Sequence, residues 1–374
     1  MASQKITYLL NWHATPYHAP VFLAQSKGYF ADEGLKVAIL EPTDPSDVTE
    51  LIGRGTADMG AKAMAGSHYR SSSSLLSRRY ALLMPLDQAA AARGYPVTAV
   101  GTILDEPFTG VIYLEGGVSG KSEGITSDFR SLKGKRIGYV GEFGKIQIDE
   151  LTKHYGLTPE DYTAVRCGMD ISAAIIEGRV DGGIGIDAVQ CVELEAYCES
   201  VGRPTSDVKM LRIDELAELG CCCFCSILSI VNDEFLKKNP EKVAAFMRAL
   251  KRAADDVQSD PVGSWEAYKA CKKTMRTAVN EKIFERCFVY FSKDLKCVER
   301  DWFKVGRYAK RLGLIADDFE LNYTNEYITW SHEAEPADPI ANQKLIAAHQ
   351  DKVRLGGGVL ASAPAPAAGI TVQA

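Results

Sequence analysis

The fold class follows from one stretch of the sequence, Arg136-Ile137-Gly138-Tyr139-Val140-Gly141-Glu142-Phe143-Gly144-Lys145-Ile146-Gln147-Ile148-Asp149-Glu150-Leu151. It predicts a strand, a turn bracketed by Gly141 and Gly144, and a helix, the unit that repeats in α/β folds. Free N–H groups at the start of such a helix favour a phosphate group, and the glycines let the backbone approach a ligand closely. The turn is therefore a candidate phosphate site. The alternative is a turn that needs glycine for its geometry alone.

The same alternation extends along most of the chain. Apolar runs predict further strands, separated by helical segments such as 45–53, at residues 6–10, 37–40, 97–104, 110–114, 164–167 and 182–186. After about residue 232 the pattern becomes helical only. Strands that alternate with helices indicate βαβ units, so we expect an α/β protein with largely parallel sheets.

Length and composition are typical of a soluble globular protein. The chain has 374 residues, enough for two core-bearing units, and is 46% hydrophobic and 25% charged. A net charge of −6 gives no reason to expect a nucleic acid or an anionic membrane as partner. The first residues lack a secretory signal pattern, and no apolar run reaches membrane-spanning length. We expect a cytoplasmic protein whose ten cysteines are reduced thiols, metal ligands or reactive groups.

The most unusual feature is a run of four cysteines in five residues: Cys221, Cys222, Cys223 and Cys225. The apolar residues 226–231 follow it, so the run predicts the start of a buried strand. Because side chains alternate along a strand, at most three of these thiols can converge on one metal ion. A cysteine-rich core strand without a metal is the alternative.

Lys62 is the candidate reactive amine. It lies among small and apolar residues after a short predicted strand. Burial lowers the pKa of a lysine, and a neutral amine can form a Schiff base with an aldehyde. The alternative is a surface lysine at the end of a strand.

Polar aromatic residues follow the first predicted strand. Trp12, Tyr17 and His18 come just beyond it, where ligands bind in open α/β sheets. Tyr17 and His18 can equally begin the next helix. A second polar aromatic cluster, at residues 322–327, has no role that its sequence indicates.

Together these motifs resemble the fungal 4-amino-5-hydroxymethyl-2-methylpyrimidine phosphate synthases, the thiamine-pyrimidine synthase family. The resemblance covers residues 6–64 and 89–330. Its motifs are Leu10-Asn11-Trp12-His13, Lys27-Gly28-Tyr29-Phe30, residues 105–110, Gly141-Glu142-Phe143-Gly144, residues 221–225 and residues 322–327. It implies a two-lobed fold of the type II periplasmic-binding-protein-like class, with a helical C-terminal part.

The resemblance also implies a particular chemistry. Pyridoxal 5′-phosphate is consumed as the small-molecule substrate and a protein histidine donates atoms. The transferase-type reaction needs iron and oxygen, and each polypeptide of a homodimer turns over once. By resemblance, Lys62 holds pyridoxal 5′-phosphate and Asn11 and Trp12 belong to the same site. The phosphate would be bound by Gly141, Glu142, Phe143 and Gly144. The iron-associated residues would be Cys221, Cys222, Cys223 and Cys225.

The chain departs from the family at the donor histidine. That position, four residues after the lysine and on the same helical face, is Gly66, and the nearest histidine is His68. Residues 65–88 are rich in serine and arginine, so they read as an atypical insertion. Our hypothesis is that this segment is mispredicted or intron-derived, which sequencing of the transcript would test. If the segment is native, we expect a chain that binds pyridoxal 5′-phosphate but makes no product.

These features predict four segments. Residues 1–109 begin the first lobe, 110–224 form the second, and 225–335 return to the first lobe as mainly C-terminal helices. Residues 336–374 form a peripheral helix and a disordered tail rich in Gly, Ala and Pro. Two other functions stay open. One is a non-catalytic protein that binds pyridoxal phosphate or the pyrimidine. The other is iron or zinc storage or sensing, which would need ligands beyond the cysteine run.

Overall fold

The computed structural model describes residues 4–64, 95–120, 124–213, 226–311, 322–330 and 339–361. Three predicted features lie outside these ranges. They are the insertion at 65–88 with Gly66 and His68, the run with Cys221, Cys222, Cys223 and Cys225, and the end of the tail beyond residue 361.

Five strands form the first sheet, in the order β2-β1-β3-β10-β4. Their bounds are β1 Gln4–Leu9, β2 Leu35–Leu40, β3 Met59–Ala63, β4 Val97–Leu104 and β10 Ile227–Asn232. β1 pairs in parallel with β2 and β3, whereas β10 runs antiparallel to β3 and β4. All six residues of β10 are buried, which confirms the buried strand expected from the apolar run after the cysteines.

The second sheet has the order β7-β6-β8-β5-β9. Its strands are β5 Thr109–Leu114, β6 Arg136–Tyr139, β7 Thr163–Arg166, β8 Gly182–Ile186 and β9 Val208–Arg212. β6 pairs in parallel with β7 and β8, and β5 runs antiparallel to β8 and β9.

The predicted strands and the α/β class are confirmed, but the expectation of largely parallel sheets is wrong because both sheets are mixed. The strands that run against their neighbours are β5 and β10. Each is the first strand after the chain has passed from one sheet to the other. Before β5, the four residues that follow β4 leave no room for a crossover helix that would return the chain to the same end of the sheet, so nothing forces a parallel pairing there.

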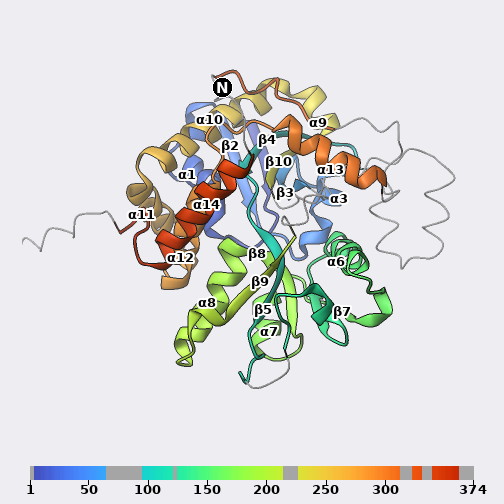
Figure 1. Ribbon diagram of the computed structural model, residues 1–374. Coiled ribbons are helices and arrows are strands. Elements are labelled where there is room, and N and C mark those ends of the chain that lie inside the picture. Colours follow the sequence, from blue (N-terminus) through green and yellow to red (C-terminus); the bar gives the residue numbers. More distant parts are fainter. Residues whose placement is uncertain are drawn as a thin grey trace, which may run out of the picture.

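Helices cover both sheets (Figure 1). In chain order they are α1 Ala19–Ser26, α2 Tyr29–Asp32, α3 Val48–Gly53, α6 Glu142–His154, α7 Ile171–Ile176, α8 Val192–Ser200, α9 Asp233–Lys238, α10 Pro240–Ser259, α11 Pro261–Cys271, α12 Ala278–Cys287, α13 Glu299–Arg311 and α14 Pro339–Arg354. Short helical turns are η1 Pro16–His18, η2 Pro45–Asp47, η4 Phe129–Leu132, η5 Pro159–Asp161, η6 Asp187–Cys191, η7 Thr205–Asp207, η9 Lys273–Met275 and η10 Phe288–Tyr290. In the described residues after β10, isolated bridges are the sole β-structure, so the predicted helical C-terminal part is confirmed.

α10 shows how the sequence builds this packing. Pro240 occupies its first turn, and the apolar residues that follow recur every three or four positions on one buried face. On that face the Phe246 ring stacks on Tyr8 of β1, with ring centroids 5.0 Å apart, and on Phe30 of α2, at 4.9 Å. The helix therefore covers the first sheet through aromatic contacts.

We call the first sheet with α1–α3 and α9–α14 the first lobe, and the second sheet with α6–α8 the second lobe. Figure 1 shows the first lobe above the second, with α8 below α12 on one side and α6 below α3 on the other. One apolar core joins Val189 and Val192 of the second lobe to Phe284 of the first. Another joins Ile184 to Leu228.

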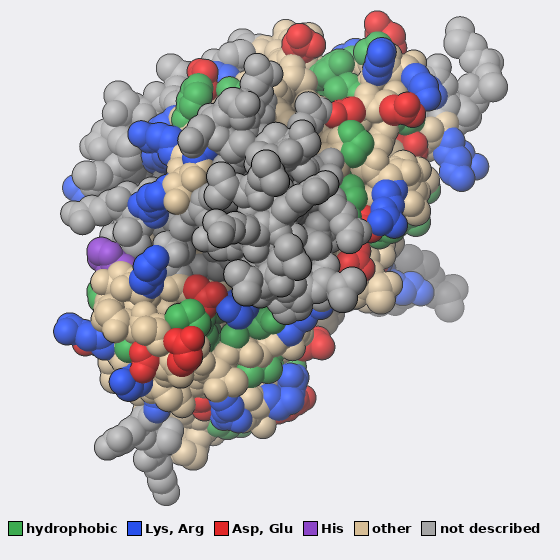
Figure 2. Space-filling model, turned by 90° about the vertical axis from the view of Figure 1, so that its right-hand side faces the viewer, with side chains coloured by type: hydrophobic (Ala, Val, Ile, Leu, Met, Phe, Trp, Pro, Cys, Tyr) green, Lys and Arg blue, Asp and Glu red, His purple; other side chains and the backbone are tan. Residues whose placement is uncertain are grey.

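The face that carries α6 and β7 shows acidic and basic side chains interspersed (Figure 2). Among the described side chains visible there, neither sign of charge gathers into a large patch. In the part of the chain that the structure describes, no helix combines the length and apolar character needed to cross a bilayer.

Candidate functional site

Lys62 lies near the carboxyl end of β3, opposite Leu228 of β10. The residue is partly buried, and its amine donates a hydrogen bond to the carbonyl oxygen of Pro45 at 2.6 Å. Burial lowers the pKa of Lys62 to about 8, although the carboxylates of Asp44 and Asp47 act in the opposite direction. This shift raises the neutral fraction of the amine near neutral pH, which is the form that acts as a nucleophile.

The turn between β6 and α6 lies against the loop that holds this amine. Gly141 is the N-cap of α6, with extended backbone at φ −143°. A Cβ atom built on Gly141 would lie 2.7 Å from Ser46 Oγ, so glycine is what permits this close approach. The Gly144 N–H donates to the Gly141 carbonyl at 2.9 Å and begins the helix. The side chains of Glu142 and Phe143 lie outside the described atoms.

Residues 44–47, which we call the 44–47 loop, therefore link the two predicted halves of the site. Pro45 contacts Lys62 from the first lobe, and Ser46 contacts Gly141 of the second. Lys62 lies near the carboxyl end of β3 and Gly141 just beyond that of β6. Ligands of α/β sheets bind at such carboxyl ends. The arrangement brings an amine of low pKa close to the start of a 13-residue helix, suited to a ligand with a carbonyl and an anionic group.

Sequence reasoning missed Arg166, which contacts the same loop from the second lobe. Arg166 is the last residue of β7, and its Nη2 lies 2.7 Å from Asp44 Oδ2 and 3.4 Å from Ser46 Oγ. Asp44 also accepts a hydrogen bond from the Ser46 N–H at 2.8 Å, as an N-cap residue does. Two signals were available: the Asp-Pro-Ser start of a helix, and an arginine at the carboxyl end of a predicted strand.

The polar side chain of Asn11 binds within its own segment. Its Nδ2 donates to the Tyr17 hydroxyl at 3.2 Å, and its Oδ1 lies 2.9 Å from His18 Nε2. The Thr15 N–H donates to His18 Nδ1 at 3.2 Å, so Nε2 carries the imidazole proton and donates to Asn11. Burial lowers the pKa of His18 to about 3, which keeps the ring neutral. A ligand contact by Asn11 stays a prediction.

Trp12 is half-buried against the core of the first lobe, and its ring centroid lies 5.8 Å from that of His13. Burial lowers the pKa of His13, while Glu41 and Asp170 act to raise it. Asp170 directly precedes α7, so a charge from the second lobe acts on His13. Ligand binding by Trp12 stays a prediction as well.

The predicted iron ligands Cys221, Cys222, Cys223 and Cys225 lie outside the described residues. Within the described ranges, no group of three or more His, Cys, Asp or Glu side chains is arranged to hold a metal ion. Ser226, which directly follows the cysteines, accepts a hydrogen bond from the Met64 N–H at its carbonyl, at 2.9 Å. Its hydroxyl accepts one from the Glu106 N–H at 3.0 Å. Ser226 is thus anchored to Met64, two residues after Lys62 along the chain.

Comparison with known proteins supplies the family. The sequence model described as NMT1/THI5 like matches residues 15–74 and 84–264. The chain belongs to this family. A relative from Aspergillus parasiticus, named 4-amino-5-hydroxymethyl-2-methylpyrimidine phosphate synthase, is 58% identical over 358 residues, covering 96% of this chain and 97% of that protein. The synthase THI13 of Saccharomyces cerevisiae, which has the same name, is 57% identical over 357 residues with the same coverage of 96% and 97%.

A solved structure supports the fold. A Candida albicans protein described as exhibiting the generic periplasmic binding protein structural fold superposes with a TM-score of 0.58. The two proteins are 12% identical in sequence, and the superposition covers 90% of this chain and 100% of the Candida albicans chain. The predicted two-lobed periplasmic-binding-protein-like fold is confirmed.

The family match also bears on residues 65–88. It leaves residues 75–83 unmatched, inside the predicted insertion, and includes the stretch through residue 74 that contains Gly66 and His68. The part of this segment without a family counterpart is therefore shorter than its composition indicates.

Proposed function

We propose that the chain makes 4-amino-5-hydroxymethyl-2-methylpyrimidine phosphate for thiamine biosynthesis, the product for which its relatives are named. The substrates would be pyridoxal 5′-phosphate and a protein histidine, in an iron- and oxygen-dependent reaction that each polypeptide completes once. The observation that supports this most directly is the proximity of the Lys62 amine, through the 44–47 loop, to Gly141 at the start of α6.

The residues present suit pyridoxal 5′-phosphate. Bound there, this molecule would supply an aldehyde for the amine and a phosphate for the first turn of α6, which the helix dipole and free N–H groups favour. Pro45 orients the amine by accepting its hydrogen bond. With a pKa of about 8, roughly a tenth of the amine is neutral at pH 7. Lys62 therefore retains a nucleophilic fraction without a dedicated base.

Iron, the transferase class, a homodimer and a cytoplasmic location belong to the same proposal and rest on the resemblance. The iron would be bound by thiols of the run Cys221, Cys222, Cys223 and Cys225, of which at most three can converge on one ion. The hydrogen bond between Met64 and Ser226 supports an iron site near Lys62, since it ties the residue after the run to the end of β3.

Gly66 favours a second candidate function. Without a histidine at the donor position, the chain would bind pyridoxal 5′-phosphate and form no pyrimidine. A non-catalytic binding protein is consistent with the fold, because the fold alone does not determine function.

Borohydride reduction of the protein with pyridoxal 5′-phosphate, followed by peptide mass mapping, tests the site. We expect a reduced adduct on Lys62 that forms faster as the pH rises through about 8, because deprotonation creates the nucleophile. Lys62→Ala should lose the adduct while other surface lysines label equally in both proteins. An adduct confined to other lysines would refute the assignment.

Product formation with iron(II) and oxygen separates the two functions. Pyrimidine phosphate from the wild-type chain, lost in Lys62→Ala, supports the synthase. Adduct without product in the wild-type chain, with product gained in Gly66→His, supports the binding protein. Undiminished product from Lys62→Ala would exclude Lys62 as the reactive amine.

A further inference from the structure

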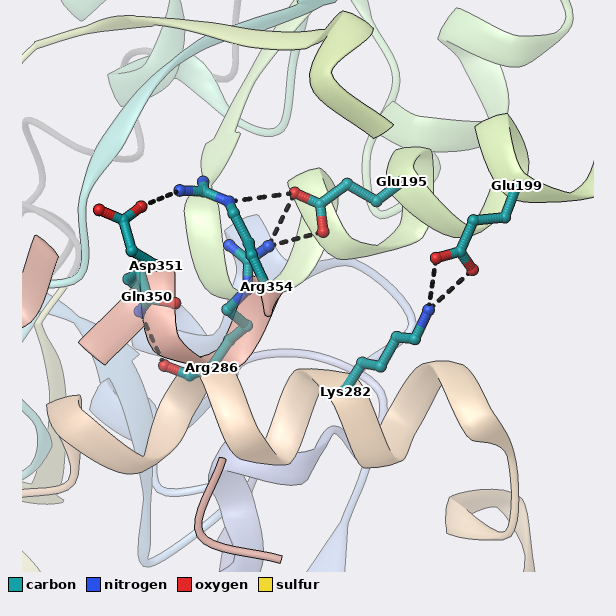
Figure 3. Close-up of polar contacts among 7 residues, drawn as sticks. All are labelled: Glu195, Glu199, Lys282, Arg286, Gln350, Asp351 and Arg354. Atoms are coloured by element: carbon teal, nitrogen blue, oxygen red, sulfur yellow. Dashed lines mark hydrogen bonds and ion pairs between the residues drawn. The ribbon is translucent and has the colours of Figure 1, made fainter. Parts of the chain in front are cut away.

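The two lobes contact each other at two edges of different character. At the first edge, α8 of the second lobe packs on α12 of the first, and Arg354 of α14 lies 3.7 Å from Glu195 of α8 (Figure 3). Arg286 donates to both carboxylate oxygens of Glu195, at 2.7 and 2.6 Å, and its side chain is 2% exposed. Val189 and Val192 join the apolar core of the first lobe beside this pair. At this edge, the Arg286–Glu195 pair is therefore buried beside packed apolar side chains.

The second edge is polar and half-exposed. Arg166 of the second lobe pairs with Asp44 of the first at 2.7 Å, and their side chains are 39% and 34% exposed. Ser46 lies against Gly141 in the same place. Asp44 precedes Pro45, whose carbonyl accepts the hydrogen bond from Lys62. The contact between the lobes and the orientation of the amine therefore depend on one short loop.

We propose that Arg166 is a positioning residue for Lys62: by pairing with Asp44 across the lobes, it fixes the 44–47 loop against the amine and keeps that amine desolvated. The proposal deepens the proposed function, on which it rests for the choice of Lys62 as the reactive group. In this assignment Arg166 acts on the amine through the 44–47 loop and not on the reacting atoms.

The charges around Lys62 determine the direction in which its pKa should change when Arg166 is removed. Asp44 and Asp47 favour the charged amine, and burial favours the neutral one. Arg166 pairs with Asp44 and also acts on Asp47, lowering the pKa that burial raises. Removal of Arg166 withdraws a cation, frees Asp44 to turn toward the amine, and admits water beside the loop. Each of these changes raises the pKa of Lys62.

Competitive acetylation with trace acetic anhydride, across a pH series that brackets about 8, measures the pKa of the Lys62 amine by peptide mass mapping. We expect Arg166→Gln to raise that pKa by ~0.5 unit, a small shift because the pair is partly solvated. Arg166→Lys, which keeps the charge, should restore most of the wild-type value. The matched control is Lys282→Gln, which removes an exposed pair between the lobes at the first edge, Lys282 with Glu199 at 2.7 Å. It should leave the pKa of Lys62 unchanged.

Two results would overturn the proposal. One is a wild-type pKa of Lys62 in Arg166→Gln. The other is an equal shift in Arg166→Gln and Lys282→Gln, which would indicate general loosening. Circular dichroism and hydrogen exchange at residues 45–48 and 141–145 show whether the variants fold and whether loosening is confined to this edge. Acetic anhydride needs no bound ligand, so failure of pyridoxal 5′-phosphate to label Lys62 rejects the proposed function and leaves this test intact.

Discussion

Among single residues, Gly141 determines how closely the two lobes approach at the candidate site. A methyl group there would meet Ser46 Oγ at 2.7 Å, so Gly141→Ala should force the turn and the 44–47 loop apart. Extra volume at a packed contact costs ~1–3 kcal/mol, so we expect roughly tenfold weaker binding of pyridoxal 5′-phosphate, measured by absorbance titration. The backbone at φ −143° accepts alanine without strain, which confines the effect to this contact.

The double variant Gly141→Ala with Ser46→Ala is the control. Removal of the hydroxyl makes room for the new methyl group, so affinity should recover toward that of Ser46→Ala alone. Equal affinity of Gly141→Ala and the wild type would show that the close approach of turn and loop is unimportant for binding.

Local chemistry explains which site residues the sequence could predict. Lys62 and Gly141 stand out because an amine among apolar residues and a glycine before a helix have meaning in their immediate neighbourhood. Asp44 and Arg166 do not, because 122 residues separate them and their pairing exists only in the folded chain. The pairing of Asn11 with His18 was partly predictable. Only seven residues separate the two, but the tautomer in which His18 donates to Asn11 depends on the contact of its ring with the Thr15 N–H in the folded chain.

At the scale of elements, α8 and α12 are joined by one buried and one exposed ion pair, so they show how burial changes the contribution of an ion pair to stability. Glu195 and Glu199 are one turn apart on α8, and Arg286 and Lys282 are one turn apart on α12 (Figure 3). Breaking a buried pair typically costs about 3–5 kcal/mol, whereas an exposed pair contributes ~0.2–1 kcal/mol. We expect Arg286→Gln to lower the free energy of unfolding by about 3 kcal/mol, since Glu195 keeps Arg354 at 3.7 Å, and Lys282→Gln by ~1 kcal/mol or less.

Urea unfolding of the two variants and the wild type measures both values. Equal losses in the two variants would contradict this assignment of the packed edge, because the side chains of Lys282 and Glu199 are 47% and 51% exposed whereas Arg286 is 2% exposed.

Strand positions were predictable and strand directions were not. Apolar runs bounded by turns indicate where a strand lies, as for β4 and β5, but periodicity is the same in either direction. Direction depends on where the chain comes from, and both β5 and β10 enter after a passage between sheets. The passage between β4 and β5 is four residues long, which leaves no room for a crossover helix. The short distance between these two apolar runs was therefore the signal in the sequence that β5 need not be parallel to its neighbours.

For the whole molecule, the two passages between sheets explain why the site lies where it does. Glu106, in the first passage, donates its N–H to Ser226, at the end of the second. Ser226 in turn holds Met64 at the end of β3, which carries Lys62. The segments that join the lobes therefore also anchor β3, the strand that carries Lys62. Movement between the lobes at this edge should therefore directly displace Lys62.

The same connectivity predicts a single unfolding transition, although the chain has two sheets. Each of the two largest apolar cores contains side chains from both lobes, such as Val192 with Phe284 and Ile184 with Leu228. Unfolding one lobe would expose the core of the other, so neither lobe should remain folded alone. Scanning calorimetry should show one peak with equal calorimetric and van't Hoff enthalpies, shifted to lower temperature but still single in Arg286→Gln. Two resolved peaks in the wild-type protein would mean that the lobes are independently stable and that their shared cores contribute little to cooperativity.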